Sequence, residues 1–427
     1  MRRFLYITPY FPPQSKVGAL RPLKFARHLP DCGWAPLALC DLRPSDAMDR
    51  DLERAVPDST RVVRDYGPRA RETERRYLAG ELPARSRGKK RKKKRIGARP
   101  LLPRALTPPP EWLPLGRHSV DMPHALRAAR GLLRAGGLEA VVVNSDPYAS
   151  LLVGLKVARE FDLPLISDLR DPWAPCALRR PGRPALQRRL VDRWERRVVE
   201  GSARVVLNTE TALEDYRRHY SDLPPERFTF IRNHGDRELI SLGELTLREE
   251  FTLLFLGRFR RFVEGGQLLR ALAELRRRGL DARRIRLVVS GGFPRDAEEL
   301  AEELGVREMI EDHPFVPYRQ VGSFMRSADL LVSLSHQTDQ RIPAKTYDYL
   351  VSSRPILMIA DNPEIERIAK DVPGIAVCPL DDAAAAADAV QAEMERGRRR
   401  EVDRDAAGFD SATAARGLAR ILDEVTA

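Results

Sequence analysis

An alternation of short β-rich runs with stretches of helical periodicity constrains the fold of this chain more than any other feature, because it occurs twice. The first series runs from Phe4 to about Leu207, and the second from Phe251 to Val377. Such alternation is typical of a mostly parallel sheet that carries helices on both faces. At 427 residues the chain is long enough for two domains with separate cores. The sequence therefore predicts an α/β protein of two Rossmann-like, doubly wound domains that face each other across a cleft.

The expected strands divide the chain into two halves. In the N-terminal domain, residues 1–240, we expect strands at Phe4–Thr8, Ala140–Val143, Leu163–Ile166 and Arg204–Leu207. In the C-terminal domain, residues 251–405, we expect them at Phe251–Leu256, Ile285–Ser290, Asp329–Leu334, Pro355–Ile359 and Ile375–Val377. The polar stretch Asp236–Glu250 is the expected linker. A last helix within residues 406–427 is expected to pack on either domain, including back on the first.

The positive charge of the chain is concentrated in one segment. The net charge is +13, and ten Lys or Arg residues lie between Arg85 and Arg99 without one acidic residue. The rest of the chain has 64 basic and 61 acidic residues, a net charge of +3, so the folded part is nearly neutral. We interpret residues 67–110, which are rich in Arg, Lys and Pro, as a mobile insertion without a fixed fold.

The centre of this segment is a run of seven consecutive basic residues: Lys89, Lys90, Arg91, Lys92, Lys93, Lys94 and Arg95. No aromatic side chains are interleaved to stack on bases, so the run offers nucleic acid only sequence-independent attraction. Near an anionic leaflet each charge contributes about 1 kcal/mol, which in sum suffices for reversible docking. The sequence thus predicts peripheral contact with an anionic membrane and no specific nucleic acid. A solvated loop that binds nothing is the alternative.

The apolar residues give no sign of a membrane span or a secretory signal. No window approaches the ~20 consecutive apolar residues that a spanning helix needs. The apolar run Phe4–Thr8 is short and leads directly into prolines, so it lacks the apolar centre of a signal peptide. We therefore expect a cytoplasmic protein.

Candidate site residues in the first half follow strands, because doubly wound domains bind ligands at the carboxyl ends of their strands. After the first strand, Gly18 opens a helix, where a small residue lets backbone amides approach a phosphate. A plain helix-entry turn is the alternative reading of this glycine.

A charged loop follows the strand at Leu163–Ile166. Carboxylates accept hydrogen bonds from sugar hydroxyls, and a guanidinium matches phosphate, so Arg170 and Asp171 are candidate catalytic residues. Asp168 and Trp173 in the same loop are candidate contacts to the acceptor. An internal Arg–Asp pair that orders the loop, and a tryptophan that only packs it, remain alternatives.

The second half repeats this arrangement. Arg258 follows the strand Phe251–Leu256, where a cation is well placed to neutralise a diphosphate leaving group. Arg260 is a further candidate for donor binding, and a solvated arginine is the alternative. Gly291 ends the next strand and permits close backbone approach, although a plain turn is equally consistent with it.

A further candidate segment precedes the strand at Pro355–Ile359. Pro343 suits the first turn of a helix, and Lys345 and Asp348 lie three residues apart on it. Such a helix can hold a phosphate at its amino end while Asp348 accepts hydrogen bonds from ribose. A surface helix with an exposed Asp and Lys is the alternative.

Taken in order, five segments resemble bacterial family 4 glycosyltransferases, the group 1 glycosyl transferases of GT-B fold. They span nearly the whole chain and are Tyr10–Gly18, Pro109–Trp112, Asp168–Trp173, Gly257–Arg258 and Pro343–Leu350. The resemblance implies a nucleotide sugar on the second domain, an acceptor on the first and retention of the anomeric configuration. It implies that Arg258 stabilises the diphosphate, that Asp348 holds the ribose, and that Gly18 admits phosphate or acceptor.

Three positions depart from the family pattern. A lysine usual after the Gly257–Arg258 pair is replaced by the segment Phe262–Glu264, Gln340 stands where the first of two spaced glutamates is usual, and Arg170–Asp171 stands where many members have His-Asp. The charged matches Asp49–Asp51 and Asp403–Asp405 fit a metal-binding pattern by chance in a chain with 32% charged residues, so we assign neither a metal nor any other cofactor.

The expected function is that of a metal-independent, retaining hexosyltransferase. It moves a sugar from a nucleoside diphosphate to a glycan or lipid-linked acceptor, in cell-envelope or exopolysaccharide synthesis, at the inner face of the plasma membrane. A nucleotide-sugar 2-epimerase of the same fold and a non-enzymatic nucleic-acid-binding protein led by the basic segment are the alternatives.

Overall fold

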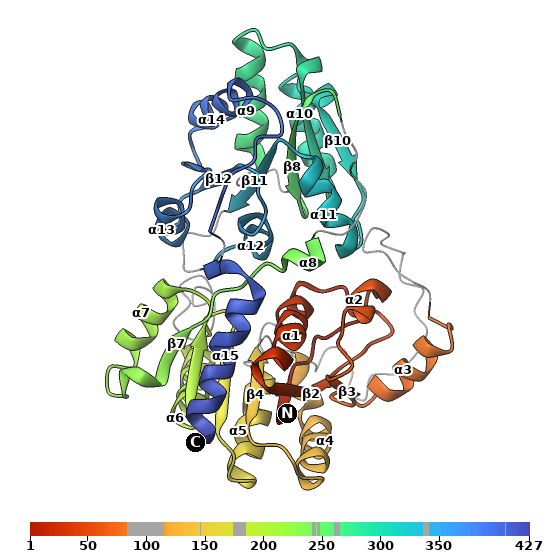
Figure 1. Ribbon diagram of the computed structural model, residues 1–427, viewed down its shortest axis with the longest axis vertical. Coiled ribbons are helices and arrows are strands. Elements are labelled where there is room, and N and C mark those ends of the chain that lie inside the picture. The colour runs from red at the N-terminus through yellow and green to blue at the C-terminus, as the bar shows by residue number, and fades with distance from the viewer. Residues whose placement is uncertain are drawn as a thin grey trace. The chain divides into compact units, whose positions relative to one another are not determined.

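The computed structural model describes residues 1–82, 115, 117–145, 147–173, 185–240, 245, 248–259, 265–335, 341–405 and 407–427. These residues form two compact units, each with its own sheet (Figure 1). Of the described residues, unit 1 contains Met1 to Arg232 together with Ala415–Ala427, and unit 2 contains Asn233–Ala414. The sequence placed the first boundary at residue 240 and the last at residue 406, whereas the chain changes unit after Arg232 and after Ala414.

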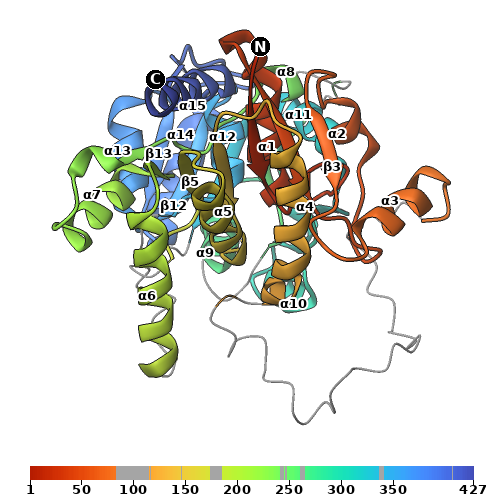
Figure 2. The same cartoon turned by 90° about the horizontal axis from the view of Figure 1, so that it is seen from below.

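Unit 1 is built on a seven-stranded parallel sheet in the order β3-β2-β1-β4-β5-β6-β7. Its strands are β1 (Arg2–Ile7), β2 (Trp34–Cys40), β3 (Arg61–Arg64), β4 (Val141–Ser145), β5 (Leu165–Leu169), β6 (Arg204–Leu207) and β7 (Phe228–Phe230). Its helices, seen around the sheet in Figure 2, are α1 (Val17–His28), α2 (Arg50–Arg54), α3 (Ala70–Leu78), the 3-10 helix η3 (Arg117–Asp121), α4 (Met122–Arg134), α5 (Ala149–Glu160), α6 (Ala185–Glu200) and α7 (Glu210–His219).

Unit 2 is built on a six-stranded parallel sheet in the order β10-β9-β8-β11-β12-β13. Its strands are β8 (Phe251–Leu256), β9 (Ile285–Ser290), β10 (Ile310–His313), β11 (Leu330–Ser335), β12 (Ile356–Ala360) and β13 (Ile375–Cys378). Its helices are α8 (Arg237–Ile240), α9 (Gly266–Arg277), α10 (Arg295–Glu303), α11 (Tyr318–Ser327), α12 (Ala344–Leu350), α13 (Pro363–Asp371) and α14 (Ala383–Glu395), and α15 (Ser411–Thr426) begins in this unit and continues in unit 1.

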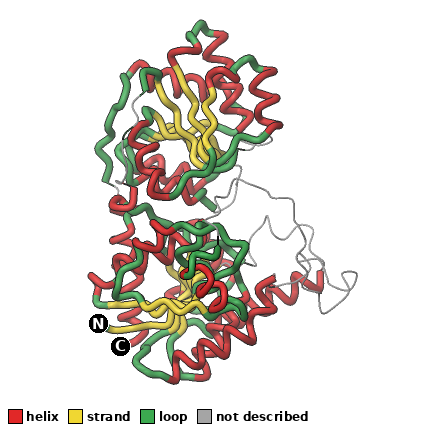
Figure 3. Tube along the Cα trace, turned by 90° about the vertical axis from the view of Figure 1, so that its right-hand side faces the viewer, coloured by secondary structure: helices red, strands yellow, loops and turns green. Residues whose placement is uncertain are grey.

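Several central strands are buried along their whole length, and Figure 3 shows helices around the strands of each sheet. All six residues of β8 and all five of β4 are buried. Strands covered by helices on both faces need apolar residues at every position, which explains the continuous runs of Leu, Phe and Val. Each fully buried Leu, Val or Phe side chain contributes about 1.5–3 kcal/mol, so these strands anchor the core of their unit.

The strand order reverses between β1 and β4 in unit 1, and between β8 and β11 in unit 2. Ligands of doubly wound domains bind outside the carboxyl ends of the strands at such a reversal. Gly18 follows β1, and Gly257 and Arg258 follow β8. The topology therefore places the predicted site segments of each unit beside the reversal of its own sheet.

Two expectations about the chain need comment. Residues 67–110 were expected to have no fixed fold, but Ala70–Leu78 form α3, which buries Ala70, Thr73 and Tyr77. That part of the expectation is wrong, because these three residues recur at helical spacing and form one face that packs. Among the described helices, none combines the length and apolarity that crossing a membrane requires.

Candidate functional site

At the carboxyl edge of the sheet in unit 2, the ends of β8 and β9 touch through glycines. Gly257 donates its N–H to the carbonyl of Ser290 at 2.7 Å. Gly257 and Gly291 have φ of 112° and 130°, and a Cβ on Gly291 would lie 2.7 Å from the carbonyl carbon of Gly257. Both positions therefore require glycine. Arg258, the next residue, is exposed, so the cation expected to neutralise a diphosphate stands at an open strand end.

Lys345, on α12, lies close to the carboxyl end of β8 although it is far along the chain from it. Its Nζ lies 3.3 Å from the ring centroid of Phe255, and 4.0 Å from where a Cβ on Gly257 would be. Pro343 occupies the N-cap position of α12, so the helix begins one residue later than expected. Tyr349, on the same helix, accepts the N–H of Leu256 at 3.0 Å. The helix is thus tied to β8, and two cations predicted to bind the donor flank one strand end.

Asp348 is held by a neighbouring helix. The hydroxyl of Tyr318, the first residue of α11, donates to Asp348 Oδ1 at 2.8 Å. Asp348 is 5% exposed. The hydrogen bond fixes the carboxylate in the carboxyl-terminal half of α12, and its contact with a ribose stays a prediction.

In unit 1, Gly18 is packed against two side chains. It lies in the first turn of α1, and a Cβ there would lie 2.7 Å from Cδ2 of Tyr10 and 2.9 Å from Nη1 of Arg170. That Nη1 is buried and has no hydrogen-bond partner among the described residues, and Nη2 makes a loose pair with Asp171 at 3.8 Å. A buried donor without an acceptor is costly, so this point favours an acceptor oxygen from a ligand.

Asp168 is not open to an acceptor. It lies within β5 and is 2% exposed. Its carboxylate accepts hydrogen bonds from both Nε and Nη2 of Arg21, each at 2.9 Å. Asn144 donates a third hydrogen bond to the carboxylate at 2.7 Å. The expected acceptor contact is therefore wrong, because the carboxylate is enclosed and engaged by α1. Asp168 pairs with Arg21, whereas Arg170 pairs with Asp171 at 3.8 Å.

Trp173 is likewise enclosed. It is 1% exposed and stacks on Tyr148, with ring centroids 4.8 Å apart and an interplanar angle of 3°. Its backbone N–H donates to the hydroxyl of Tyr216 at 3.0 Å. The expected contact to the acceptor is contradicted by this burial, since Trp173 packs the loop against Tyr148 and Tyr216.

Residues 21–234 match the glycosyl transferase 4-like domain, and residues 238–407 match the glycosyl transferases group 1. The first match alone covers half of the chain. This protein is a family 4 glycosyltransferase. Its fold is GT-B, and the family implies a nucleotide-sugar donor and an acceptor. Membership in an enzyme family contradicts the alternative of a non-enzymatic protein.

Individual relatives agree with the family. D-inositol 3-phosphate glycosyltransferase 1 of Catenulispora acidiphila is 29% identical over 218 residues, which are 47% of this chain and 52% of that protein. The chain thus matches about half the length of this relative. Sucrose-phosphate synthase of Thermosynechococcus elongatus superposes with a TM-score of 0.61 at 14% identity, over 100% and 95% of the two chains. A UDP-N-acetylglucosamine 2-epimerase superposes at 0.54 with 10% identity, over 99% and 95%. Both superpositions show the fold alone.

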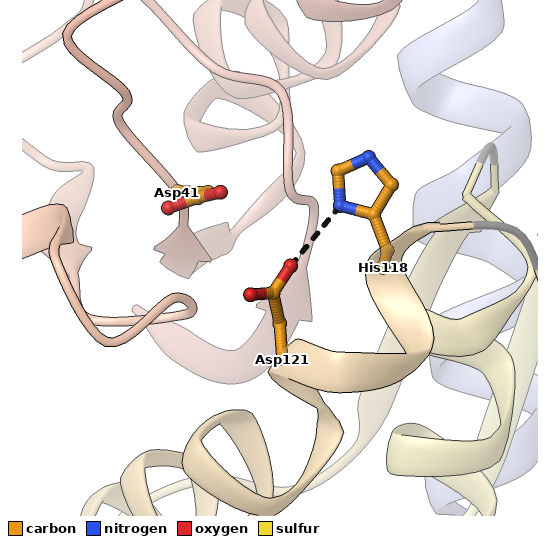
Figure 4. Close-up of side chains that lie close together, drawn as sticks. All are labelled: Asp41, His118 and Asp121. Atoms are coloured by element: carbon orange, nitrogen blue, oxygen red, sulfur yellow. Dashed lines mark ion pairs between the residues drawn. The ribbon is translucent and has the colours of Figure 1, made fainter. Parts of the chain in front are cut away.

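One group of this glycosyltransferase was not found from the sequence. Asp41 follows β2, and His118 and Asp121 lie on η3 (Figure 4). Each offers a ligand atom within 4.8 Å of the others, and His118 Nδ1 lies 3.4 Å from Asp121 Oδ2. Burial acts to raise the pKa of Asp121, but hydrogen bonds from His118 and Arg43 lower it overall.

The same group already contains a cation. Arg43 Nε donates to Asp41 at 2.6 Å, and Nη2 donates to Asp121 at 2.5 Å. A fixed guanidinium between two carboxylates repels a divalent ion and satisfies the oxygens that would bind it. We therefore interpret the group as a charge network and not as a metal centre.

Several candidates of the sequence lie outside the described residues. They are Arg260, the segment Phe262–Glu264, Gln340, the element Pro109–Trp112 and the basic run Lys89–Arg95.

Proposed function

We propose that this glycosyltransferase is a retaining hexosyltransferase that moves a sugar from a nucleoside diphosphate to a glycan or lipid-linked acceptor of cell-envelope or exopolysaccharide type. The observation that supports it most is the placement of Arg258 and Lys345 beside one strand end of unit 2. Two cations there offer charge stabilisation to a departing diphosphate.

In the proposed reaction, an acceptor hydroxyl oxygen forms a bond to the anomeric carbon while the bond from that carbon to the diphosphate oxygen breaks. Attack occurs on the face from which the diphosphate leaves, and the hydroxyl proton passes to the leaving phosphate oxygen. Arg258 and Lys345 stabilise the growing negative charge, and Asp348 accepts hydrogen bonds from the ribose. In unit 1, we propose Arg170 and Asp171 as catalytic residues. Since the two cations supply the positive charge, we propose that no metal is needed.

The experiment that tests this function begins with a thermal-shift panel of UDP-, GDP-, ADP- and dTDP-sugars. The donor that stabilises the protein is then incubated with acceptors, including an inositol phosphate because of the relative named above, with and without a chelator. We expect a new glycoside of the donor's anomeric configuration and no effect of the chelator. A new sugar nucleotide formed without acceptor would instead identify an epimerase, and an inverted product would contradict retention.

The basic segment predicts membrane docking. With about 1 kcal/mol per charge near an anionic leaflet, the protein is expected to sediment with phosphatidylglycerol vesicles at low salt and to dissociate at high salt. A variant without residues 85–99 is expected to stay in the supernatant, and phosphatidylcholine vesicles serve as the control. Equal sedimentation of the two proteins would contradict membrane docking by this segment, and with it the proposed location at the inner face of the plasma membrane.

A further inference from the structure

The two connections between the units are hydrogen-bonded to each other. The chain leaves unit 1 after Arg232 and returns at Ala415. Gly235 on the outgoing connection donates its N–H to Phe409 at 2.9 Å, and its carbonyl accepts the N–H of Ser411 at 2.9 Å. The outgoing and returning segments therefore form one paired element, and whatever holds the outgoing segment also fixes the returning one.

A single buried guanidinium holds the outgoing connection at its start. Arg21 Nη1 donates to the carbonyl of Arg232 at 2.8 Å, and Nη2 donates to that of Ile231 at 3.0 Å. These are the last two carbonyls before the chain leaves unit 1 for the first time. The same guanidinium is bidentate to Asp168, and both side chains are 3% exposed. Arg21 also lies one turn along α1 from Gly18.

The charge of this pair is well compensated. The carboxylate of Asp168 accepts hydrogen bonds from Asn144 as well as from Arg21. Burial, and after it the charge of Asp168, raises the pKa of Tyr6 well above its usual value, so the phenol stays neutral. A planar guanidinium can donate hydrogen bonds to a carboxylate and to two carbonyls at once. A lysine ammonium has a single nitrogen and cannot reach all of these acceptors. The geometry therefore specifies arginine and not merely a cation.

We propose that Arg21 is a positioning residue that fixes the exit of the chain from unit 1, at Ile231 and Arg232, relative to the loop that follows β5. Asp168 is two residues from Arg170, so one side chain sets both the exit of the chain from unit 1 and the start of the loop with Arg170 and Asp171. Arg21 itself is buried and does not touch substrate. The proposal rests on the proposed function only in assigning Arg170 and Asp171 to the reacting groups.

The test compares Arg21→Lys with Arg227→Lys. Arg227 also donates to three carbonyls of unit 1, those of Val199, Glu200 and Ser202, but away from the connections. In Arg21→Lys, amide hydrogen exchange in peptides that cover 229–236 and 168–173 is expected to accelerate about tenfold or more. We expect kcat to fall about tenfold or more, since small misplacements far from the chemistry can cost that much, while donor KM changes less than about twofold. Arg227→Lys is expected to leave all three unchanged.

Unchanged exchange and kcat in folded Arg21→Lys would overturn the proposal, and so would equal changes in both variants. If Arg21→Lys does not fold, Asp168→Asn takes its place, because it keeps the volume while it weakens the bidentate pair with Arg21 and alters the hydrogen bond from Asn144. Accelerated exchange confined to the two peptides supports the proposal, and unchanged exchange overturns it. If no donor is turned over by the unaltered protein, the proposed function fails, while the exchange measurement still decides on Arg21.

Discussion

Replacing Arg258 by alanine is expected to lower kcat/KM for the nucleotide sugar by about tenfold to a hundredfold, because it removes a cation at the carboxyl end of β8. A tenfold loss corresponds to about 1.4 kcal/mol of transition-state stabilisation. Arg258 is exposed, so the fold should not change. The effect should be largest in kcat, since charge on the leaving group grows in the transition state.

The matched control is Arg295→Ala, also in unit 2. Its side chain is 90% exposed, and it pairs with Glu299 on the surface of α10 at 3.1 Å. Steady-state kinetics with varied donor should leave this control unchanged within about twofold. Lys345→Ala should resemble Arg258→Ala. Equal kinetics for Arg258→Ala and the unaltered protein would place the leaving group elsewhere and contradict the proposed donor site.

The sequence predicted best those strands that are continuous apolar runs. The bounds of β8 and β9 agree with the expected ranges, because FTLLFL and IRLVVS carry β-favouring residues between clear breaks. The strand β2 was missed because WAPLALC contains a proline and lacks β-branched residues. The short strands β3, β7 and β10, RVVR, FTF and IEDH, have too few apolar residues to give a period.

The error at Asp168 has a specific cause. The strand was expected to end at Ile166, which puts Asp168 in a loop, but β5 extends to Leu169. A strand alternates its side chains between faces, so Asp168 points into the interface with α1, where Arg21 lies. The partner is 147 residues away along the chain and no local pattern reveals it.

The donor side could be predicted further, since Gly257, Gly291 and Lys345 each follow or precede a strand that the sequence identifies. These residues come together because β9, β8 and β11 are neighbouring parallel strands, whose carboxyl ends lie at the same edge of the sheet. The Asp41, His118 and Asp121 group could not be found, because Asp41 follows the missed β2. Its remaining members lie on a 3-10 helix that has no apolar period.

The largest stability effect is expected at Arg404, which the sequence treated as part of a chance match. It is 6% exposed, and its nitrogens donate to the carbonyls of Tyr349, Ser352, Arg354, Pro373 and Gly374. Burial lowers its pKa to about 10, and the charge of Arg400 adds to the effect. The group is therefore still a cation at neutral pH, held by carbonyl dipoles at the end of α12.

Two opposed effects decide the outcome of Arg404→Met. Removing a desolvated charge is favourable, but the carbonyls of Ser352, Arg354 and Pro373 then lose a partner, at about 1–3 kcal/mol for each buried group. We expect the carbonyls to dominate, with a net loss of about 2–4 kcal/mol and a fall of about 5–15 °C in the melting transition of unit 2. Arg404→Lys, which keeps the charge but serves fewer carbonyls, should lie between. Arg295→Met, the same change on the surface, should stay within about 0.5 kcal/mol. If calorimetry finds Arg404→Met as stable as the unaltered protein, the desolvation of the charge outweighs its hydrogen bonds, and Arg404 does not secure the helix that carries Lys345 and Asp348.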